Sequence, residues 1–338
     1  MTIQEAIAKV VRFQDLSREE AAQAMRILMS GEATAAQVAG LLTAINMKGR
    51  TVEEITGFAE TMRAFATPIH TERKPLVDTC GTGGDHSGTF NISTAAAFVT
   101  AGAGVAVAKH GNRSATSQCG SADVLEQLGV NITASPEQVG RCIDEIGIGF
   151  LFARALHGAM KHVAPVRAEL GVPTIFNILG PLTNPAGADG QVMGIYDAAL
   201  IEPIAQVLSH LGARRAFVVA GEDGLDELTL TGPSHVAEAH GGTVKRYSLL
   251  PEQFGLSRAP KEELLGGDAA KNAALLRAVL EGHPGPHRDI VLLNAAAAIV
   301  AGEQAQDIRE GIERAAAAID SGTALGKLEQ LVKVSHDS

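Results

Sequence analysis

The stretch of residues 76–130 constrains the fold of this chain more than any other part of the sequence. It holds two short apolar runs, residues 76–80 and 105–108, each followed by a polar, glycine-rich loop and then by a helix-forming segment. Brief apolar runs closed by glycine are typical of buried strands, so the pattern predicts strand, loop and helix twice in succession. Open α/β sheets bind ligands at the carboxyl ends of their strands, where helix amino ends attract anions. We therefore predict an α/β fold with a mainly parallel sheet and two adjacent loops suited to a multiply phosphorylated ligand.

The N-terminal part of the chain predicts a separate, all-helical domain. Its helix starts pair a Ser or Thr with a Glu or Gln three residues later, as in Ser17 with Glu20, Thr34 with Gln37, and Thr51 with Glu54. Apolar residues follow each start at helical spacing. Pro68 and the charged segment 71–75 indicate the passage into the next unit. We place the boundary near residue 72, with a helical domain over 1–72 and an α/β domain over 73–338.

Strands and helices alternate through the rest of the chain. The predicted strands are residues 148–153, 215–221, 235–242 and 243–249. Residues 156–170 are predicted to form one helix with several cations along it, including His157 and Arg167. The following residues, 171–187, are rich in Gly and Pro, which predicts a crossing made of turns and not a long helix.

Composition and charge exclude several classes of protein. The net charge is −10 at pH 7, whereas general binders of nucleic acid or of membrane surfaces usually carry a net positive field. The chain has no Trp and only 4% aromatic residues, which leaves few platforms for stacking bases. Its longest apolar segment, residues 290–301, contains Asn294 and is too short to span a bilayer, and the first residues hold no apolar signal core. Because Cys80, Cys119 and Cys142 lack disulfide or metal-site spacing, we expect reduced thiols in a cytoplasmic protein.

The first loop, GTGGDHSGT at residues 81–89, is called the glycine loop here. A dinucleotide fingerprint from Gly81 requires glycine where His86 stands, and a P-loop from Gly83 requires lysine where Thr89 stands. What remains is a backbone that can approach a ligand closely, with one acidic side chain, that of Asp85. The helix that follows opens with the polar residues Asn91, Ser93 and Thr94. Taken alone, the loop fits an anion site and a plain tight turn with a helix cap equally well.

The basic loop, residues 109–121, brings cations and hydroxyls to the end of the next strand. Its polar side chains include Lys109, His110, Asn112, Arg113, Ser114, Thr116 and Ser117. Lysine suits phosphate as a point charge and arginine as a planar fork. Two neighbouring loops of the same chemistry favour an anion site over a solvated basic turn. We expect Cys119 to be a packing residue, because no base is recognisably paired with it.

The acidic loop, residues 222–227, follows the predicted strand at 215–221. It contains Glu222, Asp223, Asp226 and Glu227. Mg2+ commonly joins one or two carboxylates to phosphate oxygens and water, so this loop predicts a magnesium site if it lies beside the other two. A solvated turn is the alternative.

A set of motifs spread over nearly the whole chain resembles the anthranilate phosphoribosyltransferase family of tryptophan biosynthesis. The motifs are GTGGD at 81–85, NIST at 91–94, KHGNRS at 109–114, GSADVLEQLG from 120, PVRAELGVPTIFNILGPLTNPA from 165, and GLDELT from 224. GTGGD alone is shared with related phosphorylases, whereas the ensemble is specific. The resemblance implies a nucleoside phosphorylase/phosphoribosyltransferase-like architecture in which residues of about 163–185 complete the helical domain. It also implies a cleft between the domains and a homodimer formed through the helical domain.

The resemblance further implies an activity and its residues. The family transfers the phosphoribosyl group of 5-phosphoribosyl 1-diphosphate to the amine of anthranilate, with Mg2+. By position, the catalytic residues would be Lys109, Asp226 and Glu227, the Mg2+ ligands Ser93, Asp226 and Glu227, and the anthranilate contacts Gly81, Asn112 and Arg167. The phosphoribosyl diphosphate contacts would be Gly81, Gly84, Asp85, Thr89, Asn91, Ser93, Thr94, Lys109, His110, Gly111, Asn112, Arg113, Ser114, Ala115, Thr116, Ser117 and Ser121.

One segment departs from the family pattern. The chain reads FARALHGAM at residues 152–160, where the family has FAP followed by HPAM, so the surroundings of His157 at the outer anthranilate channel differ. A pyrimidine-nucleoside phosphorylase of the same fold is one alternative, and KHGNRS and PVRAELG discriminate against it. A non-catalytic homologue that binds nucleic acid is another, and the acidic charge and the intact loops discriminate against that one.

Overall fold

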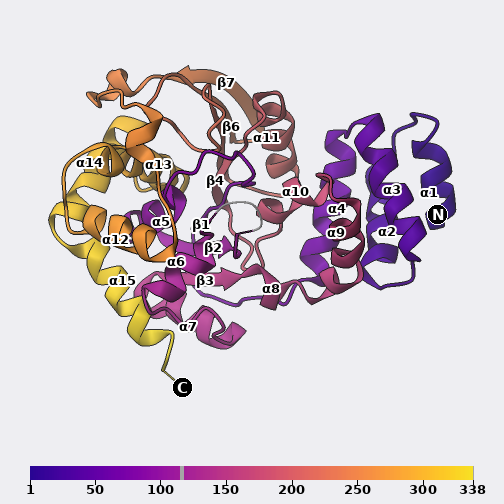
Figure 1. Cartoon of the computed structure of the whole chain (residues 1–338), viewed down its shortest axis with the longest axis horizontal. Helices are drawn as coiled ribbons and strands as arrows, with labels where there is room; N and C mark the ends of the chain where they lie inside the picture. The colour runs from indigo at the N-terminus through magenta and orange to yellow at the C-terminus, as the bar shows by residue number, and fades with distance from the viewer. Residues whose placement is uncertain (115–117, 338) are drawn as a thin grey trace.

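The computed structural model describes residues 1–114 and 118–337. A helical bundle and a larger α/β part lie side by side along the long axis of the molecule (Figure 1). Among the described residues, every helix is too short or too polar to span a lipid bilayer.

The helical bundle begins with four helices whose starting residues explain their positions. These are α1, Ile3–Val10; α2, Arg18–Met29; α3, Ala35–Lys48; and α4, Val52–Phe65. Each follows a Ser or Thr whose hydroxyl accepts a hydrogen bond from the backbone three residues on, and the Glu or Gln at that position returns the bond. The three predicted capping pairs are confirmed, and Thr2 with Glu5 adds a fourth.

The crossing segment, residues 153–185, leaves the sheet, joins the bundle and returns. It contains α8, Ala153–Leu156; η1, Gly158–His162; α9, Ala164–Leu170; α10, Phe176–Leu179; and η2, Gly180–Thr183. Val163 and Val166 share one apolar core with α1 to α4. The prediction of a single helix over 156–170 is wrong, because the chain leaves helical geometry at His157 and Pro165 then takes the first turn of a new helix.

Seven strands form one sheet in the order β3-β2-β1-β4-β5-β6-β7. Their bounds are β1, Leu76–Thr79; β2, Ala106–Gly111; β3, Ile148–Phe152; β4, Gly190–Gly194; β5, Arg215–Gly221; β6, Ser234–His240; and β7, Thr243–Leu249. The strands from β3 to β5 in this order are parallel, and β6 and β7 add antiparallel at one edge. The predicted mainly parallel sheet is confirmed, and the carboxyl ends of its parallel strands meet along one edge.

Strand β2 is longer than its apolar run of residues 105–108 indicated. It continues through Lys109 and His110 to Gly111, because hydrogen bonds to β3 persist beyond the last apolar side chain. The prediction that these three residues lie in a loop is therefore wrong. Their positions are fixed by the sheet, and residues 112–114, which follow, lie outside any strand or helix.

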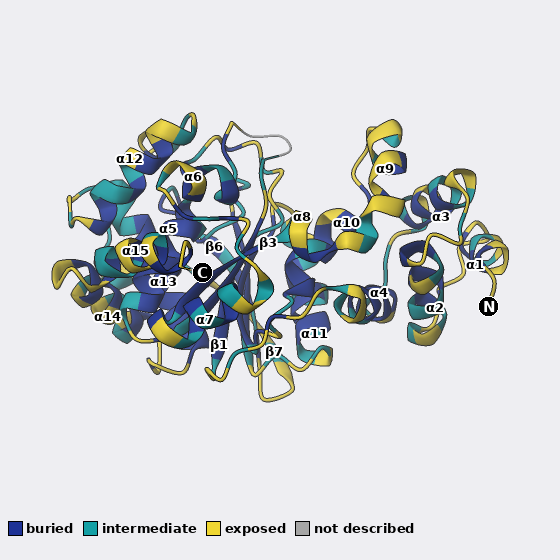
Figure 2. Ribbon diagram, turned by 90° about the horizontal axis from the view of Figure 1, so that it is seen from below, coloured by how far each residue is buried: buried dark blue, intermediate teal, exposed yellow. Residues whose placement is uncertain are grey.

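The two faces of the sheet belong to different apolar cores. Phe217 and Val219 of β5 pack on one side, and Val218 and Ala220 pack on the other together with the core of the bundle. The helices of the first core are α5, Ile92–Gly102; α6, Ser121–Gln127; α12, Ala269–Leu280; α13, Pro286–Ala301; α14, Ile308–Asp320; and α15, Thr323–Val334. The second core contains α11, Ile201–His210, while α7, Pro136–Ile146, packs on β3. Figure 2 shows α13 and the central strands of the sheet as the buried interior, whereas β7 at the edge is exposed or half-buried along its length.

Candidate active site

The glycine loop and the acidic loop pack against each other beyond the strand ends. The backbone N–H of Gly83 donates a hydrogen bond to Oδ2 of Asp226 at 2.7 Å. A Cβ at Gly81 would lie 2.6 Å from that oxygen, and a Cβ at Gly194 would lie 1.5 Å from the Asp226 carbonyl oxygen. Both positions require glycine, because a side chain would displace Asp226.

Three carboxylates meet where these loops approach the amino end of α5. Burial, and then repulsion from Glu227 and Asp85, raises the pKa of Asp226 well above its ordinary value. Burial and repulsion from Asp85 also raise the pKa of Glu227, although the charge of Lys109 and hydrogen bonds from Ser93 oppose this. Burial and mutual repulsion therefore oppose the ionised forms of Asp226 and Glu227.

This arrangement fits a hard divalent cation. The groups that converge are oxygen ligands, the carboxylates of Asp85, Asp226 and Glu227 together with the hydroxyl of Ser93. Oδ2 of Asp85 is buried and accepts no hydrogen bond from the described residues. Mg2+ prefers such oxygens, and its charge would relieve the repulsion that raises these pKa values.

Lys109 lies beside these carboxylates within β2. It is 4% exposed, and its ammonium group donates a hydrogen bond to the carbonyl oxygen of Thr79. Its charge lowers the pKa of Glu227 and of Asp78 against the larger effect of burial.

Thr94 belongs to the packed core beneath the loops, because its side chain is only 1% exposed. Its hydroxyl has no hydrogen-bond partner among the described residues.

One carboxylate of α6 binds the backbone of the basic loop at two positions. Asp123 accepts hydrogen bonds from the backbone N–H of Ser114 at 3.1 Å and of Gly120 at 2.9 Å. Arg113 turns toward the same helix, where its guanidinium contacts Asp123 at 2.8 Å and Glu126 at 2.8 and 2.9 Å. In this structure the fork of Arg113 is therefore directed at α6.

Gly111 and Ser121 bring the two ends of the basic loop together. A Cβ at Gly111 would lie 2.1 Å from the hydroxyl of Ser121, and that hydroxyl donates to the carbonyl oxygen of Asn112 at 3.3 Å. The side chain of Asn112 is exposed. The remaining predicted contacts of this loop, Ala115, Thr116 and Ser117, lie outside the described residues.

Asn91 connects the glycine loop to the basic loop. It stands at the N-cap position of α5, but its side chain makes no cap hydrogen bond. Its Nδ2 donates to the carbonyl oxygen of Cys119 at 3.3 Å, and its Oδ1 accepts from Nδ2 of Asn272 at 3.0 Å. Asn91 therefore occupies the N-cap of α5 without a side-chain cap, and its amide links the two loops instead.

Two histidines lie in contact on the opposite face of β2 from Lys109. Nε2 of His110 and Nε2 of His157 are 3.2 Å apart, so one imidazole donates a hydrogen bond to the other. Burial, and then the charges of its neighbours, lowers the pKa of His110 to about 3, and burial lowers the pKa of His157 to about 4. Both rings are therefore neutral near pH 7. Their contact ties the crossing segment to the end of β2.

Arg167 on α9 presents a half-buried guanidinium in the crossing segment. It lies over the ring of Phe176, 5.3 Å from the centroid, and donates to Oδ1 of Asn177 at 3.2 Å. Burial lowers the pKa of Arg167, but a guanidinium remains charged near pH 7. A guanidinium that is oriented by Phe176 and Asn177 is suited to bind a carboxylate.

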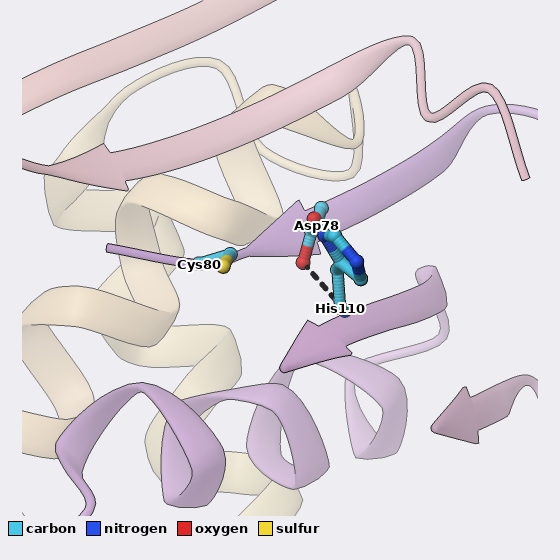
Figure 3. Close-up of side chains that lie close together, drawn as sticks. All are labelled: Asp78, Cys80 and His110. Carbon is cyan, nitrogen blue, oxygen red and sulfur yellow. Dashed lines mark hydrogen bonds between the residues drawn. The ribbon is translucent and has the colours of Figure 1, made fainter. Parts of the chain in front are cut away.

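Asp78, Cys80 and His110 form a polar cluster at the ends of β1 and β2 (Figure 3). Oδ1 of Asp78 accepts from the backbone N–H of His110 at 3.0 Å, and Oδ2 accepts from Nδ2 of Asn184 at 2.8 Å. Burial raises the pKa of Cys80 to about 12, which keeps the thiol protonated, and raises the pKa of Asp78 to about 6. Because both carboxylate oxygens already accept hydrogen bonds, we interpret the cluster as a brace that fastens the crossing segment to the sheet.

Two family models match the chain, and together they cover most of it. The helical bundle domain of the glycosyl transferase family matches residues 4–66, and the a/b domain of that family matches residues 73–325. The anthranilate phosphoribosyltransferase of Symbiobacterium thermophilum is 57% identical over 330 residues, which cover 98% of this chain and 97% of that protein. The enzyme of the same name from Moorella thermoacetica is 56% identical over 96% of both chains. The chain belongs to the anthranilate phosphoribosyltransferase family.

Solved structures of the anthranilate phosphoribosyltransferase family have the same fold. The Thermus thermophilus structure has a TM-score of 0.94 at 49% identity and covers 98% of this chain and 99% of its own. The Saccharomyces cerevisiae structure in complex with PRPP and Mg has a TM-score of 0.89 at 28% identity and covers 98% of this chain and 97% of its own. The predicted fold is confirmed, and these relatives favour the transferase over the phosphorylase alternative.

Several residues that shape the site in this family member were not among the predicted ones. Asp78 and Asn184 brace the crossing segment, Gly194 makes room for Asp226, and Asn272 holds Asn91. A charged residue inside an apolar strand, as in LVDT, is the signal that would have indicated Asp78. Asn272 gives no such signal, because its partners are distant in the sequence.

Proposed function

We propose that this protein transfers the phosphoribosyl group of 5-phosphoribosyl 1-diphosphate to the amine of anthranilate, releasing diphosphate, in tryptophan biosynthesis. The observation that carries the proposal is the convergence of the glycine loop, the acidic loop and α5 on one set of oxygen ligands. A diphosphate leaving group requires charge neutralisation at such a place. The names of the relatives and the yeast complex with PRPP and Mg support the assignment.

In this proposal 5-phosphoribosyl 1-diphosphate, the donor, binds across the glycine and basic loops. Asp226, Glu227 and Ser93 would hold Mg2+ beside it. Bound Mg2+ would neutralise negative charge as the bond between C1 and the leaving oxygen breaks. Lys109 and the backbone N–H groups of the glycine loop stabilise the same developing charge. The raised pKa values of Asp226 and Glu227 and the unpartnered Oδ2 of Asp85 support a cation at this place.

Anthranilate binds on the side of the crossing segment, where Arg167 holds its carboxylate and Gly81 and Asn112 contact it. The amine of anthranilate is an aniline, which is neutral near pH 7 and loses a proton readily once bonded to C1. A strong general base is therefore unnecessary. The neutral pair of His110 and His157 suits the orientation of an uncharged amine. A yeast relative in complex with 4-fluoroanthranilate supports an anthranilate site in this fold.

The direct test mixes the protein with anthranilate, phosphoribosyl diphosphate and Mg2+ and follows anthranilate fluorescence. We expect a steady loss of fluorescence that requires all three components. Unchanged fluorescence with folded protein would overturn the proposal. Phosphorolysis of a pyrimidine nucleoside in a parallel assay would instead favour the alternative enzyme of the same fold.

The homodimer is part of the same proposal. Val11, Phe13 and Met47 are 56%, 67% and 73% exposed. Val11 and Phe13 follow the end of α1, and Met47 belongs to α3, which packs against α1. Apolar side chains at one end of the bundle support an interface with a second copy. We expect light scattering to give a dimer that F13E with M47E converts to a monomer, whereas Y196E, outside the bundle, leaves it intact. A monomeric wild-type protein would contradict the interface.

A cytoplasmic location completes the proposal. Among the described residues Cys80, Cys119 and Cys142 form no disulfide, which agrees with a reducing compartment. Cell fractionation should recover the transferase activity with the cytoplasmic fraction. Recovery with an exported fraction would contradict this location.

A further inference from the structure

The interior of α13 contains one polar side chain within a long buried run. Residues 290–301 are all buried, and Asn294 is the polar member of this run, at 2% exposure. A polar amide in an apolar interior is unfavourable unless its hydrogen-bonding groups find partners. The partners of Asn294 therefore indicate why an asparagine stands among alanines and aliphatic residues.

Asn294 directs most of its hydrogen bonds to one residue of the neighbouring chain segment. Its Oδ1 accepts from the backbone N–H of Leu228 at 2.9 Å, and its Nδ2 donates to the carbonyl oxygen of Leu228 at 2.9 Å. Nδ2 also donates to the carbonyl oxygen of Ile290 at 2.9 Å. A side-chain amide that pairs with both backbone groups of one residue fixes the position and orientation of that residue. Leu228 directly follows Glu227.

We propose that Asn294 is a positioning residue that holds the acidic loop in the conformation that binds Mg2+. This inference rests on the proposed metal site at Asp226 and Glu227. The N–H of Gly83 in the glycine loop donates a hydrogen bond to Asp226, while Asn294 in α13 binds both backbone groups of Leu228. Glu227 therefore lies between two fixed points, one on the glycine loop side and one on α13.

Repulsion explains why such a tether is required. The carboxyl groups of Asp226, Glu227 and Asp85 lie close together in a largely buried space, and each would gain solvation by moving outward. A loop held only by its own turns would relax in that direction when no cation is bound. The pairing of Asn294 with Leu228 opposes this movement, so the ligands stay together before the metal arrives. Partners of this kind behind metal ligands commonly change metal affinity by about 10- to 100-fold.

The test measures metal binding separately from turnover. Mn2+ replaces Mg2+, and its binding is followed by electron paramagnetic resonance with phosphoribosyl diphosphate present and anthranilate absent. We expect N294A to weaken Mn2+ binding about tenfold or more and to raise the Mg2+ concentration for half-maximal rate by a similar factor. N294S is the second variant, because a serine hydroxyl can bond the carbonyl of Ile290 within its own helix without reaching Leu228. The KM for anthranilate should change less than twofold in both.

I299A is the matched control, because Ile299 is a buried residue of α13 that has no part in the pairing with Leu228. It should lower the melting temperature and leave Mn2+ binding unchanged. A wild-type measurement accompanies the variants: the amide hydrogen of Leu228 should exchange slowly with deuterium in the metal-free protein. Fast exchange at Leu228, or unchanged Mn2+ binding in folded N294A or N294S, would overturn the inference.

A failure of the metal site itself gives a different result. If D226N with E227Q leaves Mn2+ binding unchanged, the proposed ligands are wrong and Asn294 has no metal site to support. If D226N with E227Q abolishes binding while N294A and N294S bind normally, the ligands are right and only the positioning role of Asn294 is excluded.

Discussion

The half of the site built by the glycine and acidic loops differs in charge from the half built by the crossing segment. In the first, burial and repulsion raise the pKa values of Asp226 and Glu227, so the metal-free protein loses stability as the pH rises above the ordinary carboxyl range near about 4. In the second, burial lowers the pKa values of His110 and His157, so stability is lost as the pH falls below about 6.5. The first half is completed by a cation and an anionic ligand. The second half pairs its two buried histidines with each other and holds one half-buried cation, Arg167.

The largest expected effect comes from removing the charges of the first half. D226N with E227Q should lower kcat/KM by more than about a hundredfold, because the leaving diphosphate loses its charge neutralisation. Initial rates from anthranilate fluorescence measure this. E222Q is the matched control, since Glu222 belongs to the same loop and its side chain is exposed. Activity within tenfold of wild type in the double variant would remove the proposed contrast between the halves.

A smaller effect is expected from the cation of the second half. R167A should raise the KM for anthranilate about tenfold or more, because a hydrogen bond to a charged group is worth about 1.5–3 kcal/mol. The KM for phosphoribosyl diphosphate should stay within twofold. R167K keeps the positive charge but lacks the planar guanidinium, so its KM for anthranilate should lie between those of wild type and R167A. Equal changes in both KM values would contradict a role confined to anthranilate.

The opposite pH responses of the two halves give the third prediction. Between pH 5 and 8 and without metal, wild-type protein should lose stability relative to D226N with E227Q by at least about 1 kcal/mol, because the raised pKa values favour the protonated carboxyls in the folded state. Urea unfolding at several pH values measures the difference. Parallel stability curves for the two proteins would show that the pKa values of Asp226 and Glu227 are not raised in the folded state.

The smallest effect is expected on the acid side. Lowering the pH from 7.5 to 6 should destabilise wild-type protein by under about 1 kcal/mol for each buried histidine. In this range the histidines of the unfolded chain bind protons, whereas the buried rings of the folded protein stay neutral. H157N should remove its share of this loss, whereas H70N, at an exposed position, should not. An unchanged slope in H157N would contradict a neutral buried ring.

Local patterns in the sequence predicted local structure well. The capping pairs are confirmed because each depends on residues three apart, and the short strands at β1 and β5 are confirmed because each is an apolar run closed by glycine. Motifs also indicated that the acidic loop belongs beside the glycine loop, and the hydrogen bond from Gly83 to Asp226 joins them.

The features that escaped prediction depend on distant partners. The extension of β2 through Lys109 depends on pairing with β3, and the turn at His157 lies against His110, which is 47 positions away. The bond between Asp78 and Asn184 joins residues 106 positions apart, so no window of sequence contains it. Such contacts are decided by the packed fold and leave little trace in periodicity.

The course of the crossing segment has a consequence for the motion of the two domains. Residues on both sides of Arg167 pack into the bundle, and Arg63 of α4 donates a hydrogen bond to the carbonyl oxygen of Leu182 at 2.7 Å, while Asn184 is fastened to the sheet. A rotation of the bundle about this joint would carry the anthranilate side toward or away from the donor loops, and it would have to shear the apolar core that the bundle shares with one face of the sheet. Substitutions at the joint should therefore change the rate at which the bound substrates meet while leaving the affinity for each one unaltered.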